Sequence, residues 1–153
     1  MIVRNPSGED GLPDHMLRWL EAVTQRLRAE LPGRARDQAD FSGLRGSHRR
    51  VLQMIPPGGI RITDLAALAG MTKQSLGELA NWLDESGFVT SRRDENDRRV
   101  RLVSRTRLGD AAAEATSRGI AAVEERWREE IGPARYDAMK QVLRELGRDS
   151  FKR

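Results

Sequence analysis

The chain has 153 residues, of which 38% are hydrophobic and 33% charged, with a formal net charge of +4. This length predicts one domain, or one domain with helical extensions. The absence of cysteine excludes a disulfide framework and a thiolate metal site, and the absence of an apolar signal segment or of a run of about 18 apolar residues predicts a cytoplasmic protein without membrane contact.

Residues 13–31 predict an amphipathic helix that Pro13 opens and Pro32-Gly33 stops. Its apolar residues recur at spacings of three and four, at Leu17, Leu20, Val23, Leu27 and Leu31. A second, shorter helix is predicted over Ser47–Ile55, and the Pro- and Gly-rich stretch that follows ends it.

Two closely spaced helical patterns follow a short predicted strand at Ile60–Ile62. Thr63 is expected to cap the first of these helices and Gly70 to close it. Thr72 is expected to cap the second, over Lys73–Glu85. The spacing of its apolar residues turns one face to the core, with Leu76, Leu79, Ala80 and Leu83. The opposite face is polar and small, with Lys73, Gln74, Gly77, Glu78 and Asn81.

Residues 87–104 predict two short strands joined by an Arg-rich tip. Residues 89–107 contain seven Arg against three acidic residues, a localised basic patch typical of nucleic-acid binders. Two helices joined by a tight turn and followed by such a hairpin predict a winged helix-turn-helix, with one helix in the DNA major groove. The general abundance of Arg has a second explanation, a GC-rich coding sequence.

Two further helices are predicted after the hairpin, over 107–130 and 134–146, with Gly132-Pro133 between them. The expected fold class is therefore mainly α with a small β-wing. Residues 44–106 form a winged helix-turn-helix, and residues 13–31 with 107–147 form a helical dimerisation region. The apolar faces of these outer helices have too little of the chain to cover them, which favours a homodimer.

The run from Ile62 to Val89, the wing signature Asp97–Val103, and the following Thr106 and Gly109 resemble the MarR family of bacterial transcriptional regulators. The resemblance implies a homodimer in which the first and the last two helices intertwine. It also implies a repressor that binds a pseudo-palindromic operator in double-stranded DNA. Two positions depart from the family pattern: Arg105 replaces an apolar residue, and Arg93 a residue that is often Pro.

The candidate DNA-binding residues lie in three segments. They are Ser47, His48, Thr72, Lys73, Gln74, Ser75, Gly77, Glu78, Asn81, Arg92, Asp97, Arg98 and Arg99. Arg99 is expected to enter the minor groove, with its guanidinium oriented by Asp97; an ordinary surface ion pair is the alternative. The resemblance places Ser47 and His48 near a phosphate, although for His48 a capping or surface role is an equal alternative.

Trp19, Phe41 and Met54 are candidates to line a pocket for a small aromatic or phenolic effector, as the resemblance implies; a plain core role is the alternative for each. No catalytic residue, metal site or cofactor is expected, because the chain has two His, no Gly-rich phosphate loop and no nucleophile elbow. The competing functions are a winged-helix module that binds protein without DNA specificity, and a small enzyme.

Overall fold

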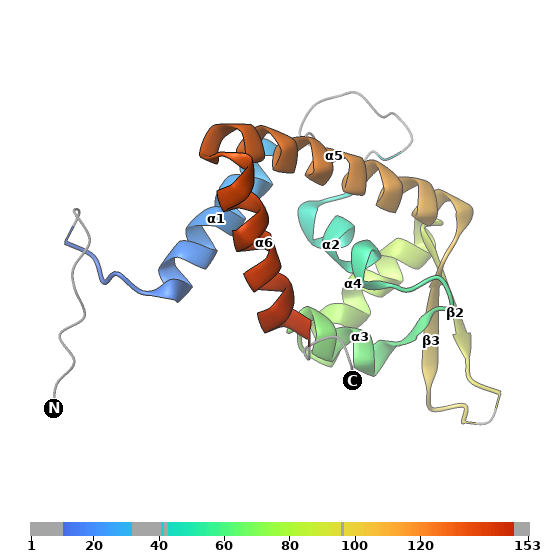
Figure 1. Cartoon of the computed structure of the whole chain (residues 1–153). Coiled ribbons are helices and arrows are strands. Elements are labelled where there is room, and N and C mark those ends of the chain that lie inside the picture. Colours follow the sequence, from blue (N-terminus) through green and yellow to red (C-terminus); the bar gives the residue numbers. More distant parts are fainter. Residues whose placement is uncertain (1–10, 32–40, 42, 96, 149–153) are drawn as a thin grey trace, which may run out of the picture.

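A computed structural model describes residues 11–31, 41, 43–95 and 97–148 (Figure 1). The elements, in chain order, are α1 (Met16–Glu30), α2 (Gly46–Met54), β1 (Ile60–Arg61), α3 (Ile62–Ala69), α4 (Lys73–Glu85), β2 (Val89–Arg93), β3 (Arg101–Arg105), α5 (Arg107–Ile131) and α6 (Pro133–Gly147). The predicted mainly helical fold with a small β-wing is confirmed. The stop predicted at Pro32-Gly33 lies outside the described residues.

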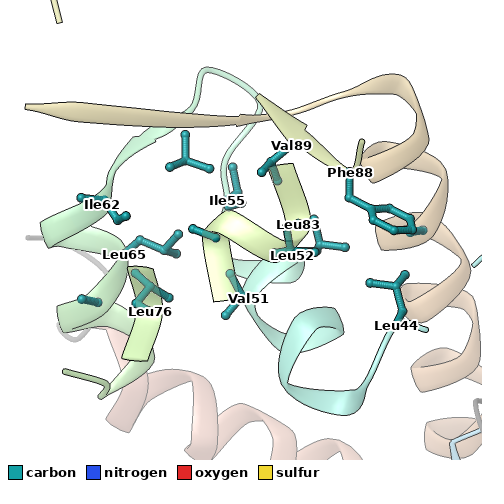
Figure 2. Packing of buried hydrophobic residues seen from close by; sticks show 14 residues of the cluster. Leu44, Val51, Leu52, Ile55, Ile62, Leu65, Leu76, Leu83, Phe88 and Val89 are labelled. Atoms are coloured by element: carbon teal, nitrogen blue, oxygen red, sulfur yellow. The ribbon is translucent and has the colours of Figure 1, made fainter. Parts of the chain in front are cut away.

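A compact core fills the space between α2, α3, α4 and the strands (Figure 2). Leu76, Ala80 and Leu83 of α4 are buried in it, and Leu79 packs against it, so the predicted core face of this helix is confirmed. Burial of these apolar side chains is the main stabilising contribution to this part of the chain. The opposite, polar face of α4 is consequently left at the surface.

The strands form one antiparallel sheet in the order β1-β3-β2. Ile60 pairs with Val103, and Val89 pairs with Arg105. The short strand predicted before α3 therefore does join the wing. Because side chains alternate along a strand, Arg101, Val103 and Arg105 share one face of β3. Val103 is buried, so the two arginines flank it on the face turned toward the helices.

Capping explains where the helices begin. Thr72 caps α4 as predicted, since its Oγ1 accepts a hydrogen bond from the Ser75 N–H at 3.1 Å. The prediction for α3 was wrong: the helix begins at Ile62 with Arg61 as its N-cap, and Thr63 lies inside it. Likewise α1 begins at Met16 and not at Pro13, because His15 caps it by accepting from the Arg18 N–H.

The turn from β3 into α5 requires glycine. Thr106 caps α5 by accepting from the Gly109 N–H, and its hydroxyl donates to the Gly87 carbonyl at 2.6 Å. A β-carbon on Gly109 would collide with the backbone carbonyl of Phe88. The absence of a side chain therefore allows the start of α5 to pack directly on the chain that leaves α4.

The long helix α5 runs from the wing at one end to α1 and α6 at the other (Figure 1). The end of α1 is tied to α5 because Glu30 accepts from the Trp127 indole at 3.0 Å and from Arg126 at 3.1 Å. None of the residues of α1 is buried. In the described part of the chain, no helix is long and apolar enough to cross a membrane.

Candidate nucleic-acid interface

The N-terminal half of α4 presents a polar surface beside the wing. Lys73, Gln74, Ser75 and Glu78 are exposed, and Gly77 is half-buried. Gly77 lies in open space, with no atom close to where a β-carbon would be. Side chains near the start of a helix can contact base edges in the major groove, and the free N–H groups of its first turn can bind phosphate. This surface is therefore polar and accessible, and its contacts with DNA stay a prediction.

The wing tip is shaped by Asp97. Its carboxylate accepts the backbone N–H of Arg99 at 3.0 Å, and its carbonyl accepts the N–H of Val100. The predicted pairing of the Asp97 carboxylate with the Arg99 guanidinium is not formed, because the carboxylate faces the backbone of the turn. Asp97 thus orients the backbone at Arg99 and does not bind the Arg99 guanidinium.

Three arginines of the wing, Arg92, Arg98 and Arg99, are exposed. Within the described ranges, none of their guanidinium groups forms an ion pair or a hydrogen bond to another residue. By contrast, Arg93 of the same hairpin donates to the Arg98 carbonyl at 3.3 Å and closes the tip. The wing consequently exposes unneutralised positive charge beside α4, which suits contacts with phosphate or a narrow minor groove.

Arg101 is a residue that the sequence analysis missed. Its guanidinium donates to Asn81 Oδ1 at 2.7 Å and to Ser91 Oγ at 2.8 Å, and it lies 3.6 Å from Asp84 Oδ2. These contacts join β3 to β2 and to α4. The strand period was the available signal, because it places Arg101 on the same face as the apolar Val103 and hence toward α4.

Arg105 has a structural role. It donates to Asp110 Oδ1 at 2.8 Å and to the Leu52 carbonyl at 3.0 Å, and its side chain is only 18% exposed. The Arg105 guanidinium is therefore bound within the protein. Arg105 fastens the base of the wing to the end of α2 and to the first turn of α5.

His48 has the predicted capping role and is buried, so the alternative of a surface histidine was wrong. Its ring stacks on Trp82, with 4.1 Å between the centroids, and Nδ1 accepts the Arg45 N–H at 3.1 Å. His48 is only 6% exposed, so little of its ring is accessible to a phosphate. Ser47, its neighbour, is exposed at the start of α2 and stays a candidate for such a contact.

The stability of the fold is expected to fall in mild acid because of His48. Burial and the nearby charge of Arg45 lower the pKa of His48 from its ordinary value of 6.5. Because the pKa is lower in the folded protein, the unfolded chain binds the proton more readily. The contribution of neutral His48 to the free energy of unfolding is therefore full above about pH 6.5 and is lost as the pH falls below it. Thermal melts between pH 7.5 and pH 5 measure the effect.

His48→Gln provides the comparison, because Gln at this position can still accept the N-cap N–H and does not titrate. The variant is expected to show a smaller decrease in melting temperature between the two pH values than the wild type. Equal decreases in the two proteins would contradict the assignment to His48.

The three candidate effector residues do not form one site. Phe41 and Met54 pack against the winged-helix core, and the Phe41 ring lies 6.4 Å from that of Phe88. Trp19 is on α1 and half-exposed, and its indole donates to Asp14 at 2.5 Å. The core role, which was the alternative for each residue, fits Phe41 and Met54.

A cleft of about 330 Å³ lies between α5 and α6. It is lined by charged groups that are largely paired, including Lys140 with Glu124 at 2.7 Å and Arg128 with Asp137 at 3.0 Å. Burial and Glu124 raise the pKa of Tyr136, another lining residue, to about 12. Among the described residues that line the cleft, each carboxylate therefore lies within ion-pair distance of a basic side chain.

Comparisons with known proteins agree with this geometry. Residues 42–100 match the model of the MarR family. A curated relative, the HTH-type transcriptional regulator PetP of Rhodobacter capsulatus, is 35% identical over 78 residues, which are 51% of this chain. The chain spans about half the length of that relative, since the match covers 46% of it.

Solved structures share the fold at low identity. A MarR family transcriptional regulator from Rhodococcus sp. RHA1 is 21% identical with a TM-score of 0.68, over 84% of this chain and 89% of that one. FabT of Streptococcus pneumoniae, solved in complex with DNA, is 17% identical with a TM-score of 0.68, over 86% and 92%. CouR of Rhodococcus jostii RHA1, solved with p-coumaroyl-CoA bound, is 20% identical with a TM-score of 0.65, over 87% and 91%. The winged-helix segment of the chain thus matches the MarR family of transcriptional regulators over residues 42–100, and the solved structures share the fold of the chain.

Proposed function

We propose that this regulator is a homodimeric repressor that binds a pseudo-palindromic operator in double-stranded DNA. The observation that carries the proposal is the juxtaposition of the polar face of α4 with the unneutralised wing arginines Arg92, Arg98 and Arg99. The helix supplies hydrogen-bonding groups for base edges, and the wing supplies charge for the flanking backbone and minor groove. The candidate contacts in α2 and α4 are Ser47, Thr72, Lys73, Gln74, Ser75, Gly77, Glu78 and Asn81.

We assign residues 44–106 to DNA binding and residues 13–31 with 107–147 to dimerisation. Apolar side chains support this division, because large ones are exposed along α1 and α6 and only sparsely elsewhere among the described residues. They include Met16 at 67% exposure and Leu146 at 68%. Monomeric soluble proteins rarely expose an apolar surface of this extent. A second copy of the chain would cover it and place two α4 helices on the DNA.

The alternative is a winged-helix module that binds protein without DNA specificity. Such a module is expected to expose an apolar face on α4. That face is polar, with Lys73, Gln74 and Glu78 at its surface. The basic wing beside it also fits an anionic partner better than an apolar one. DNA therefore remains the preferred partner.

Release from the operator by a small aromatic or phenolic effector is the finer part of the proposal. Its support is a precedent in the fold, since CouR was solved with p-coumaroyl-CoA bound. Trp19 is the candidate effector residue that remains available, because its ring is half-exposed at the proposed dimer face. An effector changes DNA affinity only by binding one conformation better than the other.

The test is operator binding across a salt series, after selection of bound sequences from random DNA. A dimer that neutralises roughly 6–10 phosphates should show log K falling with log salt at a slope of about −0.9 per phosphate. The two α4 helices should contact half-sites about ten base pairs apart between centres. Shifting one half-site by a few base pairs should therefore weaken binding strongly.

Affinity that is indifferent to this spacing, with no preference over random DNA, would indicate a non-specific basic protein. Such a result would remove the proposal of a sequence-reading regulator.

A further inference from the structure

Arg101 connects the wing to the helix that carries the proposed base contacts. Its guanidinium spans Ser91 of β2 and Asn81 of α4, with donor–acceptor distances of 2.8 Å and 2.7 Å. The Arg101 side chain is only 23% exposed. A hydrogen bond in such a partly dry site is stronger than one in water. Asp84, whose Oδ2 lies 3.6 Å away, adds an opposite charge on the same helix.

This contact determines how the Asn81 amide is oriented. A guanidinium has five N–H donors and no acceptor, so the Asn81 atom that faces it must be the carbonyl oxygen. The amide nitrogen, with its two donors, then points away from Arg101. Asn81 is exposed on the polar face of α4, two turns beyond Gln74 and one beyond Glu78. Its donors are therefore available to a molecule bound at this face.

The orientation restricts what Asn81 can recognise. A free Asn reads adenine through two bonds, one that it donates to N7 and one that it accepts from N6. In this chain, a donor from adenine would have to approach the oxygen that already binds a guanidinium cation. Acceptor atoms meet no such competition. They comprise phosphate oxygens, N7 and O6 of guanine, and O4 of thymine.

We propose that Arg101 is a positioning residue that fixes Asn81 as a hydrogen-bond donor toward DNA. Asn81 then binds an acceptor atom, on a phosphate or on a guanine or thymine edge, and does not make the bidentate adenine contact. This inference rests on the proposed DNA-binding function and specifies the chemistry of one contact in it.

Asn81→Asp is the first variant, because it is nearly isosteric and keeps the oxygen that accepts from Arg101 while it removes both donors. DNA affinity is expected to fall by about tenfold or more, the loss of one hydrogen bond with added repulsion from phosphate. Thermal stability is expected to be retained, since the pairing with Arg101 becomes an ion pair. Wild-type DNA affinity in this variant would overturn the proposal.

Arg101→Met is the second variant, since it keeps most of the aliphatic length without the donors. A double-mutant cycle with Asn81→Ala should give affinity losses that are less than additive, because Arg101 acts through Asn81. Additive losses would mean that Arg101 only supports the wing, and would overturn the positioning role. Ser91→Ala is the matched control: it removes another contact of the same guanidinium and is expected to leave DNA affinity within about twofold of wild type.

Selection from random DNA distinguishes the two sources of the acceptor. For a base contact, Asn81→Ala loses a guanine or thymine preference at one position of each half-site, and Arg101→Met admits adenine there. For a phosphate contact, Asn81→Ala weakens all sequences equally. An adenine preference of the wild type that Asn81→Ala abolishes would overturn the inference. If the wild-type protein selects no DNA sequence, the result contradicts the proposed function. The affinity of Asn81→Asp for random DNA would then still decide whether Asn81 contacts a phosphate.

Discussion

Leu143→Glu is expected to convert the protein from a dimer at micromolar concentration to a monomer and to abolish tight operator binding. Leu143 is 46% exposed in α6, beside the exposed Met139, Val142 and Leu146. A buried, unpaired carboxylate at the centre of an apolar interface carries a large desolvation cost. A monomer then places only one α4 on the DNA, and the second half-site contributes nothing to its affinity. Light scattering and a binding titration measure the two effects.

Gln141→Glu is the matched control, since helix periodicity places this exposed residue on the other side of α6 from Leu143. The control is expected to remain dimeric and to bind the operator. Circular dichroism should show that both variants are folded, because the core around α2, α3 and α4 does not include Leu143. A wild-type protein with a clean monomer mass, or a dimeric Leu143→Glu variant, would refute the assignment of this face.

Arg99→Ala is expected to weaken operator binding by about 1–3 kcal/mol, the range for one specific contact. Arg99 is exposed at the wing tip, and its guanidinium has no partner among the described residues. Asp97→Ala should weaken binding less, because Asp97 acts on Arg99 through the backbone N–H at 3.0 Å. Fluorescence anisotropy with a labelled operator measures both effects, and thermal melts should show little change in the stability of the fold.

Arg118→Ala controls for the loss of positive charge alone. Arg118 is 70% exposed on α5 and pairs with Glu114 in the same helix. It is expected to leave operator affinity nearly unchanged. An Arg99→Ala variant that binds as tightly as the wild type would remove the wing tip from the DNA interface, whatever the other variants show.

The amino-acid sequence alone determined the elements whose causes are local. The bounds of α4 follow from the Thr72 cap and from apolar residues at spacings of three and four, both of which are legible along a single helix. The hairpin follows from two short strand patterns around a charged tip. The polar outer face of α4 follows in turn, because a helix with one buried face must expose the other.

Tertiary structure alone decided what several polar residues do, because their partners lie far away in the chain. Arg105 binds the carbonyl of Leu52, 53 positions earlier, and Arg101 binds Asn81, 20 positions earlier. His48 is buried because the Trp82 ring of another helix stacks on it. Local spacing indicates at most the face on which such a residue lies, as it does for Arg101, and does not encode these pairings. They arise when packing of the apolar core brings α2, α4 and the wing together, and charged side chains at its edge then bind the nearest polar atoms.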